Sequence, residues 1–231
     1  MTQTAETPTD SPDLAPEDPR SIYAGAIRTA RAALEQLTDN TLTQPTPCDD
    51  FDVRAMAGHL VSTVARVAAL GRGEDMFDVP GITERADDDW VAALDDAAAA
   101  AHDAFADAST LDAMYHLPWA SMPGFALMIT YTNEVTVHTW DVAKGAGIAT
   151  DIEWDDRVVR AAYEGIQIGL PADGRRESFE EALANMPDEI AQVSQMPFDE
   201  VQSTAPDAPL IDRLVAWNGR RPDWEADQPG A

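Results

Sequence analysis

Apolar side chains recur every three or four positions along most of this chain of 231 residues, the spacing of one face of an amphipathic helix. The pattern predicts four long helices, over about residues 20–38, 53–70, 84–108 and 125–144. Breaks in the sequence support these limits, because Pro45 and Pro47 exclude a helix between the first two segments and Gly71 ends the second. Asp52 stands where the N-cap of the second helix is expected.

Three shorter helices are expected after the fourth segment. They cover about residues 155–168, the surroundings of Phe179, Leu183 and Met186, and the stretch from a cap at Asp207 to Asn218-Gly219. No segment alternates with period two, and none repeats another. The predicted fold class is therefore all-α, a four-helix bundle with additional short C-terminal helices.

The same pattern divides the chain into three parts. Residues 1–19 contain scattered prolines among Thr, Ser, Asp and Glu and no aromatic residue, so we expect a disordered, acidic tail. Residues 20–148 form the predicted bundle. Residues 149–226 supply the helices that we expect to pack on it.

Charge and cysteine content narrow the possible partners. The formal net charge is -27, from 42 acidic and 15 basic residues, so nucleic acid and anionic membranes are poor partners. A single cysteine, Cys48, excludes an internal disulfide and fits a reducing compartment. With no signal-peptide pattern and no uncharged stretch long enough to span a bilayer, we expect a cytoplasmic protein, either a monomer or a homodimer.

Two polar residues interrupt the most apolar of the predicted helices. Glu134 and His138 are four residues apart, so their side chains lie on one face of the helix. A buried carboxylate needs a cation or several hydrogen-bond donors, and a divalent metal would meet that need. His59 on the second helix is a candidate third ligand, although a hydrogen-bonded core histidine is also a common role. Two imidazoles and a carboxylate suit zinc and leave a coordination position open, while nickel, iron and manganese accept the same donors.

Several further residues have two interpretations each. Cys48 is either a fourth, soft ligand or a small buried filler, and Asp141 is either a hydrogen-bond acceptor for a ligand imidazole or part of an ion pair between helices. His116 is a candidate for the mouth of the site, whereas His102 is expected to be exposed. Finally, Trp119 and Tyr131 either line a pocket or pack in the core.

Three segments of the chain resemble one protein family. They are TPCDDFDVR at 46–54 with Gly58-His59-Leu60 after it, EVTVHTWDVA at 134–143, and DRLVAWNGRRPDW at 212–224. These are similar to hallmarks of the mycothiol-dependent maleylpyruvate isomerase-like proteins, in their short and mostly uncharacterised branch. That family belongs to the wider group of DinB-like metal-binding helical bundles.

The resemblance implies a DinB-like bundle with a metal held by His59, Glu134 and His138. It also implies mycothiol, or a similar low-molecular-weight thiol, as a cosubstrate that the metal activates for a transferase or isomerase reaction on an electrophilic small molecule. The chain departs from the isomerase at Phe51, which replaces a tryptophan. We also expect it to lack the larger C-terminal domain that carries basic residues in the isomerase. Arg213 or Arg220 is a candidate substitute for those residues, and a helix-surface or C-cap role is the alternative.

Two other functions remain open at this level. The same ligands would serve a non-catalytic metal-binding sensor or regulatory module. A metal-dependent hydrolase is the weaker alternative, because no separate general base is evident in the sequence.

Overall fold

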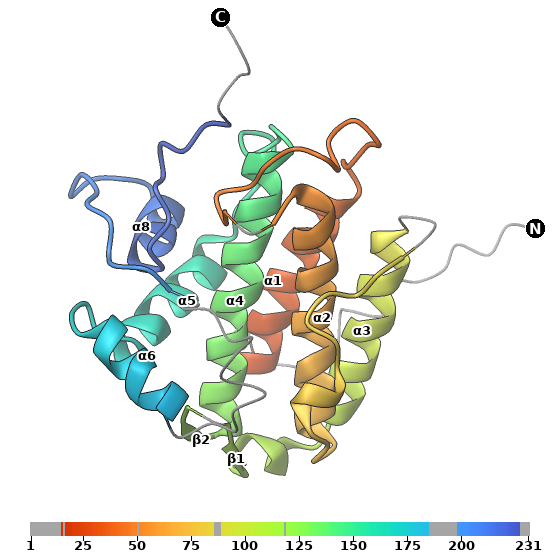
Figure 1. Cartoon of the computed structure of the whole chain (residues 1–231). Helices are drawn as coiled ribbons and strands as arrows, with labels where there is room; N and C mark the ends of the chain where they lie inside the picture. Colours follow the sequence, from red (N-terminus) through yellow and green to blue (C-terminus); the bar gives the residue numbers. More distant parts are fainter. Residues whose placement is uncertain are drawn as a thin grey trace, which may run out of the picture.

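The computed structural model describes Ala15 and residues 17–49, 51–85, 89–117, 119–184 and 198–226. A bundle of long helices forms its centre (Figure 1), and these are α1 (Pro19–Leu34), α2 (Val53–Gly71), α3 (Trp90–Ala104) and α4 (Gly124–Gly145). Three shorter helices follow, α5 (Asp156–Gly169), α6 (Arg175–Ala184) and α8 (Leu210–Trp217). The predicted all-α class is confirmed for the described residues.

The helices pack in a closed ring around one apolar core. Helix α1 contacts α3 and α4, and α2 contacts the same two helices from the other side. Completely buried side chains such as Met56, Leu60, Leu94 and Leu127 fill the centre. A smaller cluster joins α5 and α8 to the bundle through Val137 of α4, so the C-terminal helices lie against the helix that carries two of the predicted ligands.

Aspartates at the helix starts explain why several helices begin where they do. The Asp52 carboxylate accepts a hydrogen bond from the backbone N–H of Ala55 at 2.8 Å, which confirms the predicted cap of α2. Asp89 does the same for Ala92 at 3.0 Å, so α3 begins at Trp90. The predicted start near residue 84 was therefore wrong, and so was the predicted end near 108, because α3 stops at Ala104.

Two other predicted limits differ from the structure. Helix α1 ends at Leu34 rather than near residue 38. A separate turn follows, in which the Thr41 hydroxyl accepts a hydrogen bond from the backbone N–H of Thr38 and donates one to its C=O. Helix α8 has Pro209 at its cap position, with no side-chain cap from Asp207.

A two-stranded antiparallel hairpin, absent from the prediction, precedes α4. It pairs β1 (Met114–His116) with β2 (Ser121–Pro123), and Tyr115 lies opposite Met122. Strands of three residues are too short to show a period-two pattern. Two short 3-10 turns, η1 (Met76–Asp78) and η2 (Ala108–Leu111), complete the described elements.

The division into parts at residues 20–148 and 149–226 stays a prediction. The predicted disordered tail falls almost wholly outside the described residues, and Met186 of the second short helix also lies outside them. None of the helices in the described part of the chain combines the length and apolarity needed to cross a bilayer.

Candidate metal centre

Helix α4 presents Glu134 and His138 to the same place. The Nε2 atom of His138 lies 3.3 Å from the Oε2 atom of Glu134. The imidazole is buried, while the Glu134 side chain keeps 22% of its surface exposed. The predicted pairing of these two residues on one face is therefore what the structure shows.

Helix α2 brings His59 to the same place, and Gly58 makes its position possible. Gly58 lies against the backbone of Thr83, where a Cβ would come within 2.4 Å of the carbonyl oxygen. This close approach holds the segment containing Gly81 against α2. The Gly81 carbonyl oxygen lies 2.8 Å from Nδ1 of His59. Because a carbonyl only accepts, Nδ1 carries the hydrogen and Nε2 is the nitrogen with a free lone pair.

The two imidazoles lie edge to face. Their ring centroids are 4.8 Å apart, with an interplanar angle of 80°. The His59 ring also stacks on Phe51, at a centroid distance of 5.3 Å. Phe51 therefore occupies the place next to a candidate ligand, so its replacement of the tryptophan expected from the resemblance keeps an aromatic wall there.

A buried ion pair supports His138 from behind. The Nδ1 atom of His138 lies 3.4 Å from Oδ2 of Asp141, and Nη2 of Arg220 lies 3.1 Å from the same oxygen. Both predicted roles of Asp141, imidazole acceptor and ion-pair partner, are present together. Arg220 also donates to the carbonyl oxygen of Asn218 at the end of α8, at 3.0 Å. The C-cap role considered for Arg220 is thus found, within the protein interior.

A second buried contact ties the same C-terminal turn to α4. The side-chain amides of Asn133 and Asn218 donate to each other's oxygen, at 3.0 and 2.9 Å, and both residues are completely buried. The short segment after α8 therefore contacts α4 twice, at Asn133 and at Asp141.

The electrostatic environment favours a neutral imidazole at His59 and a positive charge at His138. Burial, and next the charge of the neighbouring His138, lower the pKa of His59 to about 4, so this ring is neutral at neutral pH. Burial alone would also lower the pKa of His138. Hydrogen bonds to Asp141 and Glu134, together with their negative charges, outweigh it and raise that pKa above its usual value. The carboxylates thus attract positive charge to this imidazole, whether a proton or a metal ion supplies it.

Two imidazoles and a carboxylate are chemically suitable ligands for a divalent metal. In the described residues, however, their donor atoms do not surround a common point at bonding distance. Within the described ranges, no group of three or more His, Cys, Asp or Glu side chains is arranged to hold a metal ion. The 3.3 Å between Nε2 of His138 and Oε2 of Glu134 is nevertheless close to the separation of two ligands in a tetrahedral zinc site with bonds of about 2.0–2.1 Å. The assignment of His59, Glu134 and His138 as ligands stays a prediction.

Arg66, which the sequence analysis missed, lies near the same site. It follows His59 by two helical turns on α2, and its Nη2 lies 3.9 Å from the point that a Cβ of Gly81 would occupy. Its Nε atom is buried and has no hydrogen-bond partner among the described residues. The signal available in the sequence was the seven-residue spacing from His59, which places both residues on one face.

The remaining candidates lie in other surroundings. His116 is exposed on β1, with Nδ1 2.8 Å from the Ser121 hydroxyl. The hairpin precedes the start of α4, and Glu134 follows that start by about 15 Å of helix. Trp119 is half exposed, and His102 is exposed as expected. Arg213 lies over the Tyr163 ring, 5.0 Å from its centroid.

Cys48 and Tyr131 lie closer to the centre of the bundle. Cys48 is partly buried and packs against the main core. Tyr131 is buried, with a pKa raised first by that burial and then by the charge of Glu134, while Arg66 opposes the shift. Tyr131 therefore packs in the core, within electrostatic range of the site.

The bundle and its polar centre define the class of protein, an all-α DinB-like helical bundle. The family model described as "Mycothiol maleylpyruvate isomerase N-terminal domain" matches residues 23–143, and the chain belongs to this family. That range includes His59, Glu134 and His138.

Two relatives come from Mycobacterium tuberculosis. The uncharacterized proteins Rv0738 of strain H37Rv and MT0763 of strain CDC 1551 are each 28% identical to this chain over 162 residues, which cover 70% of this chain and 86% of the relative. No solved structure matches the chain.

Proposed function

We propose that this protein is a metal-dependent enzyme that acts on an electrophilic substrate with mycothiol or a similar low-molecular-weight thiol. The reaction is either transfer of the thiol to the substrate or isomerisation of the substrate. The observation that carries the proposal is the meeting of His59 with Glu134 and His138 in the bundle. Each imidazole has its Nδ1 directed to an acceptor, which leaves Nε2 of both rings for a metal. Family membership supports the link to a thiol.

A bound divalent ion, zinc by the donor types, would lower the pKa of a thiol and so produce the nucleophile at neutral pH. His59, Glu134 and His138 would hold the ion. Asp141 fixes the ring orientation of His138, and Phe51 covers one face of His59. Addition of a thiolate to a carbon–carbon double bond would leave a rotatable single bond, and elimination would release the isomer.

The position of Arg66 favours an electrophilic substrate that carries a negative charge. Its guanidinium is close enough to influence the pKa of both His59 and Tyr131, and its Nε has no partner among the described residues. The charges of Glu134 and Asp141 would be balanced by Arg66 and Arg220, so a divalent ion would leave two positive charges. A thiolate and one anionic group of the substrate would neutralise them. Arg66, rather than Arg213 or Arg220, is therefore the basic residue that we assign to the substrate.

Metal analysis of the purified protein tests the proposal. We expect about one equivalent of divalent metal in the parent protein and in His116→Ala, which removes an exposed histidine, but little in His59→Ala or Glu134→Ala. Stoichiometric metal in both site variants would contradict the ligand assignment. Thiol-dependent consumption of monochlorobimane then tests catalysis, and bound metal with no turnover of several thiols would favour a non-catalytic sensor or regulatory module.

The same proposal extends to partners. A small-molecule thiol and an electrophile are the expected ligands, and the net charge of -27 argues against nucleic acid or an anionic membrane surface.

A further inference from the structure

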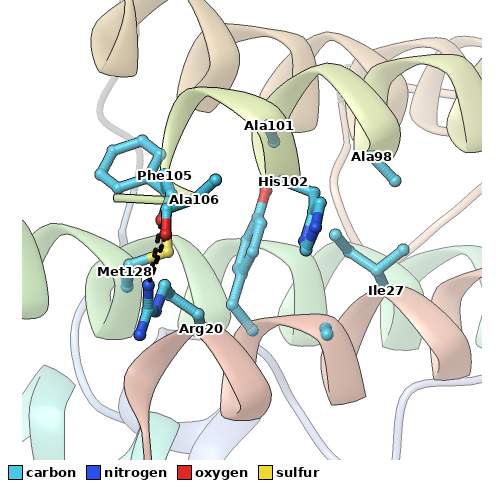
Figure 2. A pocket seen from close by; sticks show the side chains of 10 residues that line it. Arg20, Ile27, Ala98, Ala101, His102, Phe105, Ala106 and Met128 are labelled. Atoms are coloured by element: carbon cyan, nitrogen blue, oxygen red, sulfur yellow. Dashed lines mark hydrogen bonds between the residues drawn. The ribbon is translucent and has the colours of Figure 1, made fainter. Parts of the chain in front are cut away.

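Arg66 keeps an uncompensated charge in a strongly acidic protein. No hydrogen bond or ion pair of its guanidinium is found among the described residues, although the chain has 42 acidic residues. Arg20 on α1 shows the contrasting arrangement, because its guanidinium lies 2.7 Å from the Asp18 carboxylate. It also donates to the carbonyl oxygens of Phe105 and Ala106, at 3.3 and 3.1 Å (Figure 2). The charge of Arg66, unlike that of Arg20, can therefore serve a ligand.

The end of the Arg66 side chain is the part that a ligand can reach. Its Nε atom is buried, whereas the two Nη atoms are not closed off from solvent. Nη2 lies 3.9 Å from the point that a Cβ of Gly81 would occupy, and Gly81 is exposed. The carbonyl oxygen of Gly81 in turn contacts His59. The guanidinium therefore lies at the accessible edge of the candidate metal centre.

Helices α2 and α4 pack antiparallel, in a register that two contacts define. The Val53 side chain, at the start of α2, lies against Gly145 at the end of α4, where a Cβ would come within 2.8 Å of it. Six residues after Val53 and seven before Gly145, the rings of His59 and His138 meet at a centroid distance of 4.8 Å. Residues at equal distances from the histidine pair therefore lie opposite each other.

Arg66 of α2 and Tyr131 of α4 form the next level of this register. Each lies seven residues from the histidine of its helix, close to two full turns, so it keeps the face of that histidine about 10 Å further along the bundle. The electrostatics agree with this placement. Burial, and next Glu134, raise the pKa of Tyr131, while the charge of Arg66 opposes the shift.

The Tyr131 hydroxyl is a second donor without a partner among the described residues. The residue is 5% exposed, and its oxygen is not closed off from solvent, whereas the unpaired hydroxyl of Tyr23 on α1 is. Because its pKa is raised, the Tyr131 phenol keeps its proton at neutral pH and donates. A guanidinium and a phenol at one level both need an acceptor, and a carboxylate offers two oxygens.

We propose that Arg66 and Tyr131 form a carboxylate-binding subsite beside the candidate metal centre. The Nη atoms of Arg66 bind the carboxylate, and the Tyr131 hydroxyl donates to one of its oxygens. Glu134 does not fill this role, because its carboxylate is directed to His138 at 3.3 Å. The use of the subsite for a substrate rests on the proposed function: the electrophile would carry a carboxylate at one end and meet the thiolate at the other.

Titration of the full-length protein as purified, followed by amide chemical shifts, tests this subsite. The probes are butanoate and butanamide, which have similar shapes and differ in charge. Salt at roughly 0.15 M limits the repulsion between butanoate and the acidic surface. We expect butanoate to shift amides of α2 and α4 and to bind at least about tenfold more tightly than butanamide, the effect of charge-assisted hydrogen bonds.

Two variants, each with a matched control, separate the two donors. Arg66→Met is expected to remove the preference for butanoate, and Tyr131→Phe to weaken butanoate binding about fivefold, the effect of one hydrogen bond. Arg28→Met changes an exposed arginine of α1 and Tyr163→Phe a partly buried tyrosine of α5, and both are expected to bind butanoate like the parent protein.

Three results would overturn the subsite: equal affinities of the parent protein for the two probes, shifts that map away from α2 and α4, or a preference for butanoate that survives Arg66→Met. An unchanged butanoate affinity in Tyr131→Phe would overturn the role of Tyr131. Neither probe is an electrophile and no thiol is added, so the titration does not depend on turnover. A protein that binds butanoate as expected but holds no metal and consumes no thiol would contradict the proposed function alone.

Discussion

Replacing Arg220 by methionine removes one partner of a buried ion pair. In the folded protein, Nη2 and Nε of Arg220 lie 3.1 and 3.4 Å from the two carboxylate oxygens of Asp141, and Asp141 has no exposed surface. Methionine keeps most of the length and apolar volume of the arginine. The variant therefore leaves the carboxylate of Asp141 in the interior, with His138 as its remaining partner.

The expected loss is large for a single substitution. Truncating one side of a buried ion pair costs about 3–5 kcal/mol, because the other charge remains desolvated. We expect the lower end, about 3 kcal/mol, because His138 still contacts Asp141. The hydrogen bond from Arg220 to the carbonyl oxygen of Asn218 is lost as well.

The loss depends on pH in a defined direction. Burial alone raises the pKa of Asp141, but Arg220 and His138 outweigh it and hold that pKa below its usual value. The pair thus adds stability above the unfolded Asp pKa of about 3.9 and loses it as the pH falls through the lowered pKa. In Arg220→Met, burial is less opposed and the pKa of Asp141 rises. The difference in unfolding free energy between parent and variant is expected to be full at pH 7 and to shrink toward acid pH.

Urea denaturation followed by circular dichroism at several pH values measures this difference. Arg221→Met is the matched control, because its guanidinium meets Asp223 at 3.5 Å on the exposed surface, where substitutions usually change stability by less than about 0.5 kcal/mol. If Arg220→Met destabilised the protein no more than Arg221→Met at pH 7, the buried pair would not have the role assigned here. Asp141→Asn combined with Arg220→Met is expected to recover part of the loss.

Three further predictions concern the surroundings of the site. Gly58→Ala would place a Cβ 2.4 Å from the Thr83 carbonyl oxygen. We therefore expect the free energy of unfolding, measured by urea denaturation, to fall by about 1–3 kcal/mol and zinc binding to weaken. An unchanged zinc affinity would contradict the link between Gly58 and the position of His59. Asn218→Ala leaves the buried amide of Asn133 without its side-chain partner and should cost about 1–3 kcal/mol in the same assay, whereas a loss below about 0.5 kcal/mol would speak against the amide pair. Arg66→Met should raise KM for an anionic electrophile and leave KM for a neutral one unchanged, and an equal effect on both would remove Arg66 from substrate binding.

Local sequence signals predicted the helical framework well. The predicted helix over 53–70 matches α2 within one residue, because an apolar stripe, an Asp cap and a terminal glycine agree there. The start of α3 was misplaced by about six residues. Its cap, Asp89, directly follows Asp87 and Asp88, and nothing in the sequence distinguishes the capping aspartate from the other two. Helix α1 was predicted too long because the apolar spacing continues from Leu34, its last residue, to Leu37.

The sequence predicted the candidate ligands, but it did not predict the groups that hold them in place. Glu134 and His138 lie within one helix, so their spacing alone places them together. The Gly81 carbonyl that orients His59, and the Arg220 side chain that reaches Asp141, come from segments 22 and 79 residues away in sequence. Contacts of this kind depend on how helices pack, and helical periodicity carries no information about them.

X-ray absorption at the zinc edge, on protein loaded with one equivalent of zinc, tests the proposed centre most directly. Ligation by His59, Glu134 and His138 predicts imidazole scattering from two rings and nitrogen or oxygen neighbours at about 2.0–2.2 Å. A sulfur neighbour at about 2.3 Å, which Cys48 would have to provide in the absence of added thiol, or scattering from fewer than two imidazoles, would contradict the assignment.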